Sequence, residues 1–166
     1  MTTISTMARR LWLLGAATAL FVGSAGVVPA HADNAKKTLE SLTAMLKEAG
    51  LKSTVDAKIP AHILVFEGKG GRKFPFVVAV ADDILILYSV IAIADQMTRP
   101  AGIEAGLLAA NFDYGFYKLV FDKKGSLIFK YDIYESMVDA KDLKKLIMDM
   151  VANTNNFYDN APFIKK

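Results

Sequence analysis

The chain has 166 residues, of which 22% are charged and 53% are hydrophobic, and it contains no cysteine. Its 20 basic and 17 acidic residues give a formal net charge of +3. These values exclude disulfides, thiolate chemistry and cysteine metal sites, and they disfavour a strongly basic nucleic-acid binder. A chain of this length is expected to fold as one domain around a single hydrophobic core.

The first 32 residues have the pattern of a cleavable secretory signal. Arg9 and Arg10 precede an apolar run over residues 11–28, and Pro29-Ala30-His31-Ala32 then supplies an A-x-A cleavage site. The run approaches membrane-spanning length, but its glycines and the cleavage site favour removal after Ala32. We therefore expect a bacterial protein that is periplasmic or secreted and keeps no membrane anchor. The arginine pair leaves the general secretory and twin-arginine routes both open.

Cleavage would leave residues 33–166 as one domain with few side chains suited to catalysis or metal binding. Two basic residues and no acidic one lie in the removed part, so 18 basic residues face 17 acidic ones and the net charge falls to about +1. A charge this close to zero gives no support to a nucleic-acid partner. His62 is the one histidine left, and it has neither the further ligands of a zinc site nor a recognisable nucleophile beside it. We therefore expect no enzyme, no metal and no cofactor.

Hydrophobic periodicity predicts eight elements after the signal. Apolar residues recur at helical spacing over residues 36–49, and Gly50 suits the left-handed position that ends a helix. Residues 52–61 stay ambiguous between a loop and an edge strand, because of Pro60. The remaining predicted elements are strands 62–66, 74–80 and 84–93, a helix that begins near residue 98, strands 116–121 and 127–134, and a helix that begins at residue 139 and ends in an irregular tail over 155–166.

This order, α-β-β-β-α-β-β-α, predicts an α+β domain with an antiparallel sheet on which the helices pack. In the run 84–93 apolar side chains occupy both odd and even positions, whereas a strand with one solvated face should alternate apolar and polar residues. Either this strand is central and lies under helices, or a partner covers its second face.

The polar loops are better explained as turns than as ligand sites. The glycine-rich run 68–71 joins two strands, whereas a phosphate loop leads from a strand into a helix. Asp82 and Asp83 are adjacent, so on a strand they point to opposite faces. The loop 122–126 lacks the alternating acids of a calcium site, and Gly125 suits a hairpin turn.

Aromatic residues gather around the second predicted hairpin. Such residues commonly fill a core, and tyrosines are also enriched at protein interfaces. As candidate partner-contacting residues we take Phe76, Tyr88, Tyr114, Phe116 and Tyr117.

Short motifs in the second half of the chain resemble the YbjN family, whose fold is similar to that of type III secretion chaperones. Leu107-Leu108-Ala109-Ala110-Asn111, residues 117–127 and residues 130–134 carry this resemblance, together with residues 74–78 and a helix ending Asn156-Phe157. Asn111 and Asp132 match the asparagine and aspartate positions of that family, and both a functional and a structural role stay open for them. The resemblance implies a non-enzymatic α+β domain that often pairs with itself, in a fold whose chaperones hold extended segments of other proteins. Because the export signal departs from a cytoplasmic chaperone, no type III role is carried over.

The leading hypothesis is an exported, non-catalytic protein-binding or chaperone-like module. It would form a homodimer or hold a polypeptide on its sheet and second helix. The alternative is a periplasmic carrier of a small molecule or lipid, with an apolar pocket between sheet and helices. A hydrolase that uses His62 beside an acid is the least favoured class.

Overall fold

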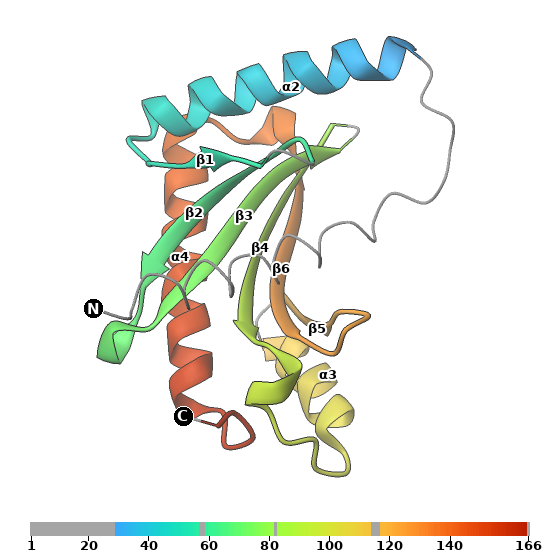
Figure 1. Ribbon diagram of the computed structural model, residues 1–166, viewed down its shortest axis with the longest axis vertical. Helices are drawn as coiled ribbons and strands as arrows, with labels where there is room; N and C mark the ends of the chain where they lie inside the picture. Colours follow the sequence, from blue (N-terminus) through green and yellow to red (C-terminus); the bar gives the residue numbers. More distant parts are fainter. Residues whose placement is uncertain (1–28, 57–58, 82, 114–116, 166) are drawn as a thin grey trace, which may run out of the picture.

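The computed structural model describes residues 29–56, 59–81, 83–113 and 117–165 of the chain (Figure 1). It shows the predicted α+β domain, an antiparallel sheet with helices packed on it, and the strand order is β1-β2-β3-β4-β6-β5. The strands are β1 (Thr54–Val55), β2 (Ala61–Glu67), β3 (Lys73–Ala81), β4 (Ile84–Ala92), β5 (Lys118–Phe121) and β6 (Leu127–Tyr134). The α-helices are α2 (Pro29–Glu48), α3 (Ile103–Asp113) and α4 (Ala140–Asn160), and short 3-10 turns are η2 (Lys69–Gly71), η3 (Ala94–Gln96) and η4 (Glu135–Met137).

Two predicted glycine positions are confirmed by the backbone. Gly50 ends α2 with φ +69°, and the N–H of Leu51 donates to the carbonyl of Leu46 at 2.9 Å. This bond and that from Gly50 N–H to Lys47 O at 3.0 Å form a Schellman ending. Gly125 has φ +80° in the turn between β5 and β6. Both turns therefore follow from local sequence alone.

Both later helices differ from their predicted bounds. The first α3 residue is Ile103 rather than a residue near 98, because Gly102 has φ +83° and breaks the helical backbone before it. Helix α4 continues to Asn160, so the prediction of an irregular tail from residue 155 is wrong. The apolar stripe continues through Thr154 and Phe157, which are buried and half-buried, and this packing holds the last turns helical. A two-residue strand, β1, lies in the segment that the sequence left ambiguous.

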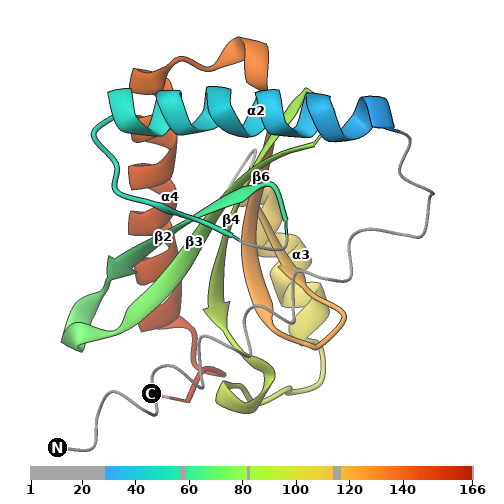
Figure 2. The same ribbon diagram turned by 45° about the horizontal axis from the view of Figure 1, so that its top comes forward.

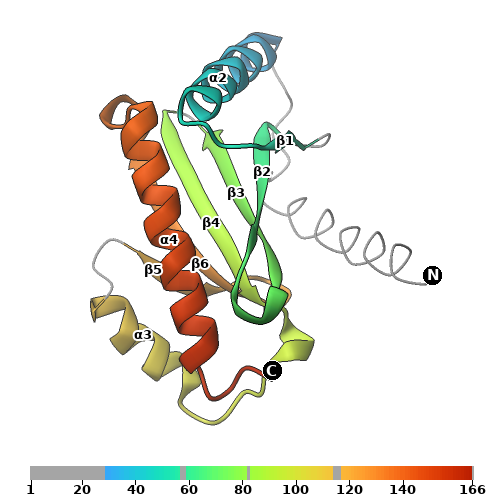
Figure 3. The ribbon, with the colours of Figure 1, turned by 90° about the vertical axis from the view of Figure 1, so that its left-hand side faces the viewer.

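The hydrophobic core lies on one face of the sheet. Figure 3 shows α4 along that side, with α3 on the same side, and Figure 2 shows α2 crossing the end of the sheet. All three contribute to one buried cluster, α2 through Leu42 and Leu46, α3 through Ile103 and Leu107. The cluster also includes Phe74, Phe76, Leu85, Leu87, Phe129, Leu143, Ile147 and Met150. None of the helices in the described part of the chain combines the length and the apolar character needed to cross a membrane.

The prediction that both faces of β4 are covered is met on one face. Leu85, Leu87 and Ser89 are fully buried against the helices, whereas the alternate residues Ile86 and Tyr88 are half-buried. Within the described ranges, each of the three helices packs on the core side, so none covers the other face. The structure confirms that β4 is central, between β3 and β6, and a partner on its second face stays a prediction.

Candidate protein-contact surfaces

The face of the sheet opposite the helices is predominantly apolar, and we call it the open face. Strand pairing places its side chains in rows across the sheet, because residues opposite each other share a face. One row runs through Ile63, Val77, Tyr88 and Lys130, and another through Ala79, Ile86 and Asp132. The open face consists of Ile63, Val65, Val77, Ala79, Ile84, Ile86, Tyr88, Val90, Lys118, Val120, Ile128, Lys130, Asp132 and Tyr134.

Several open-face side chains are freely accessible to a partner. Val65 and Tyr134 each expose 58% of their surface and Ile84 exposes 37%, whereas Val77, which lies between them in the sheet, exposes only 7%. Exposed apolar side chains that form one continuous patch commonly mark a protein contact.

The charges on the open face largely neutralise each other. Lys130 Nζ lies 2.8 Å from Asp132 Oδ2, and both side chains are partly exposed. Burial, and secondarily the charge of Asp56, raises the pKa of Tyr88 to about 12, so its phenol stays neutral at physiological pH. The patch therefore presents neutral apolar groups around this ion pair, with the exposed Lys118 opposite Lys130 at the β5 edge.

A second apolar surface lies on α3, and we call its exposed residues Ala105, Leu108, Ala109 and Phe112 the α3 ridge. Leu108 and Phe112 expose 73% and 90% of their surfaces. They are four residues apart, so they lie next to each other on one helix face. The opposite side of α3 buries Ile103 and Leu107 in the core. A helix that is apolar on both sides is unusual at a solvent boundary and is typical of an interface.

The five candidate partner-contacting residues do not form one surface. Tyr88 lies on the open face, whereas Phe76 is fully buried in the core and offers no surface to a partner. Tyr117 lies on the core side, where its ring centroid is 5.3 Å from that of Phe129 and 5.2 Å from that of Tyr131. Tyr114 and Phe116 lie outside the described residues.

Asn111 connects α3 to the edge strand β5. Its side-chain Nδ2 donates to the carbonyl of Leu119 at 3.0 Å, and its Oδ1 accepts the N–H of Leu119. The side-chain amide of Asn111 thus makes the two hydrogen bonds that the backbone of a neighbouring strand would otherwise make with Leu119. Asp132, by contrast, contacts Lys130 on the exposed side of β6. Both positions have a structural explanation in this fold.

His62 is a buried residue that joins three segments. Its Nε2 lies 2.9 Å from Thr43 Oγ1 on α2, and its Nδ1 lies 2.8 Å from Ser53 Oγ. Thr43 donates its own hydrogen to the carbonyl of Leu39, so Nε2 carries the ring proton and donates to Thr43. Desolvation by burial lowers the pKa of His62, although the backbone of Leu39 opposes this shift.

The surroundings of His62 offer little to catalysis or metal binding. It lines neither of the two described cavities. In the part of the chain that the structure describes, no three acidic or histidine side chains come together in a way that could hold a metal ion.

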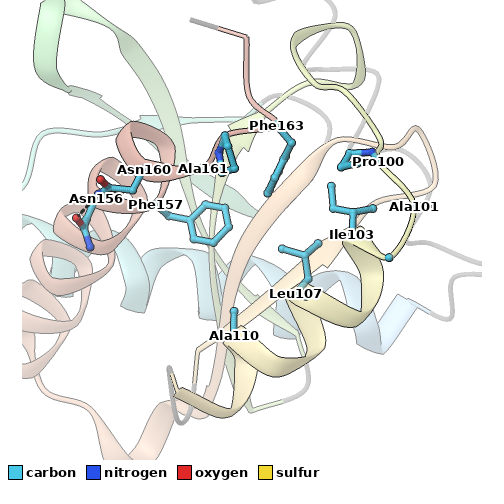
Figure 4. A pocket seen from close by; sticks show the side chains of 13 residues that line it. Pro100, Ala101, Ile103, Leu107, Ala110, Asn156, Phe157, Asn160, Ala161 and Phe163 are labelled. Carbon is cyan, nitrogen blue, oxygen red and sulfur yellow. Dashed lines mark hydrogen bonds between the residues drawn. The ribbon is translucent and has the colours of Figure 1, made fainter.

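A groove lies between α3 and the C-terminal end of α4 (Figure 4), with a volume of about 520 Å³. Phe157 and Phe163 face Ile103 and Leu107 across it, and Asn156 and Asn160 lie on its α4 side. The sequence hypothesis placed a protein contact on the second helix, but it named neither Leu108 nor Phe112 as a contact residue and did not identify the groove. The available signal was the uniformly apolar composition of residues 105–110.

Comparison with solved structures finds proteins of similar fold. The complex of ExsC with ExsE matches with a TM-score of 0.57 and 13% identity, covering 77% of this chain and 96% of that chain. YbjN from E. coli, named as a candidate transcription regulator, gives 0.56 and 13%, with the same coverage of 77% and 96%. The fold of this chain is that of YbjN and of the type III secretion chaperones.

The same YbjN-like fold occurs in the HopA1–SchA chaperone–effector complex, with a TM-score of 0.54, 11% identity and coverage of 75% of this chain and 92% of that chain. No family model and no curated protein matches the sequence. At such low identity the likeness extends to the fold, and the surfaces described above must carry any argument about function.

Proposed function

We propose that this protein is an exported, non-catalytic module that binds polypeptide on its open face and pairs with a second copy through the α3 ridge. The observation that carries the proposal is the apolar open face, over which none of the three described helices packs. The chaperone–effector complexes among the structural neighbours support a protein partner. Export is supported by the secretory pattern of the first 32 residues.

The open face suits an apolar polypeptide segment because it offers neutral side chains in several rows. Burying one valine or isoleucine side chain contributes about 1.5–3 kcal/mol, so a few such contacts suffice for measurable binding. A carboxylate placed among these residues would lose its hydration against an apolar partner. Polypeptide binding should therefore be sensitive to a single negative charge on this face.

The matched substitutions Val65→Glu and Val55→Glu test this surface. The two valines expose 58% and 53% of their surfaces, but only Val65 belongs to the open face. The assay measures how well the mature chain prevents aggregation of a chemically unfolded client protein. We expect wild type and Val55→Glu to protect the client and Val65→Glu to protect it at least several-fold less. Equal protection by both variants, or none by the wild type, would contradict the proposal.

The α3 ridge suits contact with a second copy because a twofold axis brings the same patch of each molecule together. The small side chains of Ala105 and Ala109 allow close approach of two helices, while Leu108 and Phe112 supply apolar area. Light scattering should show a dimer of the mature chain, which Leu108→Glu converts to a monomer and the exposed-site control Lys118→Glu does not. A wild-type monomer at all concentrations would refute self-association.

Export is tested separately from both contacts. Expression of the full chain in a bacterium, followed by cell fractionation and N-terminal sequencing, should give a periplasmic or secreted product that begins at Asp33. Retention of the uncut chain in the cytoplasm would overturn this part of the proposal alone.

A further inference from the structure

Charged side chains on the open face are confined to the end formed by β5 and β6. The open-face positions contributed by β2, β3 and β4 are all uncharged. Those contributed by β5 and β6 include Lys118, Lys130 and Asp132. The open face is therefore an uncharged apolar area that borders a corner where two lysines lie.

One positive charge in this corner has no counter-charge among the described residues. Lys130 Nζ lies 2.8 Å from Asp132 Oδ2, whereas no salt bridge joins the exposed Lys118 to an acidic group in the described part of the chain. Lys118 and Lys130 lie directly opposite each other on β5 and β6. Like charges in this arrangement repel each other and destabilise the pairing of the strands. A negative group bound beside Lys118 would relieve that repulsion.

Other charged groups on this side of the sheet offer no such place to a negative group. Where β2 and β3 meet at their hairpin, the exposed Glu67 lies opposite the exposed Lys73, so charges of opposite sign face each other there. The negative charge of Asp56 lies close to Tyr88, since it contributes to the raised pKa of that phenol. A carboxylate on a bound partner is therefore disfavoured beside Asp56 and favoured at Lys118.

We propose that the open face selects polypeptide segments that combine apolar side chains with a nearby carboxylate, which pairs with Lys118. This inference rests on the proposed polypeptide binding and adds to it the sign of the charge that the bound segment carries. Tyr88, Lys130 and Lys118 are successive members of one row across the sheet, so Tyr88 and Lys118 are two strand spacings, or about 9.6 Å, apart. An extended segment advances about 3.3 Å per residue and presents every second side chain on one face. A carboxylate two or four residues from an apolar side chain therefore comes within reach of the flexible lysine.

Three nine-residue peptides with blocked ends test this selection. They are SVSWSVSES and its counterparts with glutamine or lysine in place of the glutamate, and each presents valine, tryptophan, valine and the variable residue on one face when extended. The single tryptophan of the chain, Trp12, lies in the segment expected to be removed, so tryptophan fluorescence of a mixture with the mature chain reports the peptide alone.

The expected differences in affinity follow from the exposure of Lys118. An exposed ion pair changes an equilibrium constant by at most about fivefold. We therefore expect the glutamate peptide to bind about threefold to fivefold more tightly than the glutamine peptide, and the lysine peptide to bind most weakly. Because salt screens exposed charges, the differences should disappear in about 0.5 M NaCl, whereas binding through the apolar side chains should persist.

Charge reversal at Lys118 locates the preference. Lys118→Glu should invert it, so that the lysine peptide binds more tightly than the glutamate peptide. The matched control Lys123→Glu makes the same change of charge at the exposed turn between β5 and β6 and should preserve the preference of the wild type. Thermal melts verify folding, and Lys118→Gln, which should abolish the preference, serves in place of a Lys118→Glu variant that does not fold.

The outcomes separate this inference from the proposed function. Equal binding of the three peptides by the wild type, or an unchanged preference in a folded Lys118 variant, would overturn the assignment of the carboxylate and leave polypeptide binding in place. Loss of binding to both charged peptides in a folded Lys118→Glu variant would likewise overturn the charge pairing. Absence of binding by all three peptides would overturn the inference together with the proposed function of the open face.

Discussion

Replacement of Asn111 by alanine should destabilise the fold without touching either proposed contact surface. The side chain makes two hydrogen bonds to the backbone of Leu119, a residue that is 2% exposed. Each such bond contributes about 0.5–1.5 kcal/mol net, and the loss leaves a buried N–H and C=O without their partner. We therefore expect Asn111→Ala to reduce the free energy of unfolding by about 2 kcal/mol.

Urea denaturation of the mature chain measures this change, with Asn156→Ala as the matched control because Asn156 is exposed and bonds within its own helix. For a domain of this size, about 2 kcal/mol corresponds to a fall in the melting temperature of about 7 °C. A change below about 0.5 kcal/mol together with lost client protection would show that Asn111 acts in binding, and it would refute the structural explanation.

Three further predictions concern the stability of the fold. Burial holds the pKa of His62 in the folded chain below 6.5, so the unfolded chain takes up a proton first as the pH falls. The free energy of unfolding should therefore decrease as the pH drops below about 6.5. Urea denaturation at two pH values should show this dependence in the wild type and not in His62→Gln. Gly68→Ala should destabilise the fold by about 1–3 kcal/mol, because the added Cβ would collide with Asn155 Oδ1. Gly106→Ala should stabilise the fold by about 0.5–1 kcal/mol, because its Cβ meets no neighbouring atom. Equal melting temperatures of the two variants would contradict this description of the packing. Asp132→Ala removes an exposed ion pair and should change the unfolding free energy by less than about 1 kcal/mol; a larger loss would reveal a further role.

The order of the elements was accessible from the sequence because it depends on local signals. Glycines at positions 50 and 125 have no Cβ and adopt the positive φ values that end α2 and close the second hairpin. The double apolar pattern of residues 84–93 likewise indicated an internal strand, and β4 lies between β3 and β6.

The end of α4 was missed because tertiary contacts override a weak local preference there. Residues 153–156 include three asparagines, which are poor helix formers. In the fold, Asn155 accepts a hydrogen bond from Arg72 Nη2 at 2.9 Å. The Arg72 guanidinium also lies 3.8 Å from the ring centroid of Tyr158, and burial lowers the pKa of this group. These contacts tie the last turns of α4 to the β2–β3 hairpin.

The structure places the candidate contact residues on different sides of the sheet. A single sequence could not predict this, because it does not reveal which face of a strand meets the helices. Phe76 and Val77 alternate along β3, and only the register with β4 places Phe76 on the helix side of the sheet and Val77 on the opposite side. The α3 ridge was obscured for a related reason, since apolar residues around the whole helix give no preferred side.

The last residues of the chain complete the tertiary structure rather than trailing from it. Ile164 is buried and pairs with Met97 through an isolated β-bridge, and the N–H of Thr98 donates to the carbonyl of Phe163 at 2.7 Å. The segment before α3 therefore reaches its final position only when a partner that lies some 65 residues later is present. A chain that emerges from the ribosome N-terminus first can close this part of its core only after residues 163–164 have emerged. Deletion of Phe163 and Ile164 should thus delay or prevent folding more than the loss of two side chains suggests.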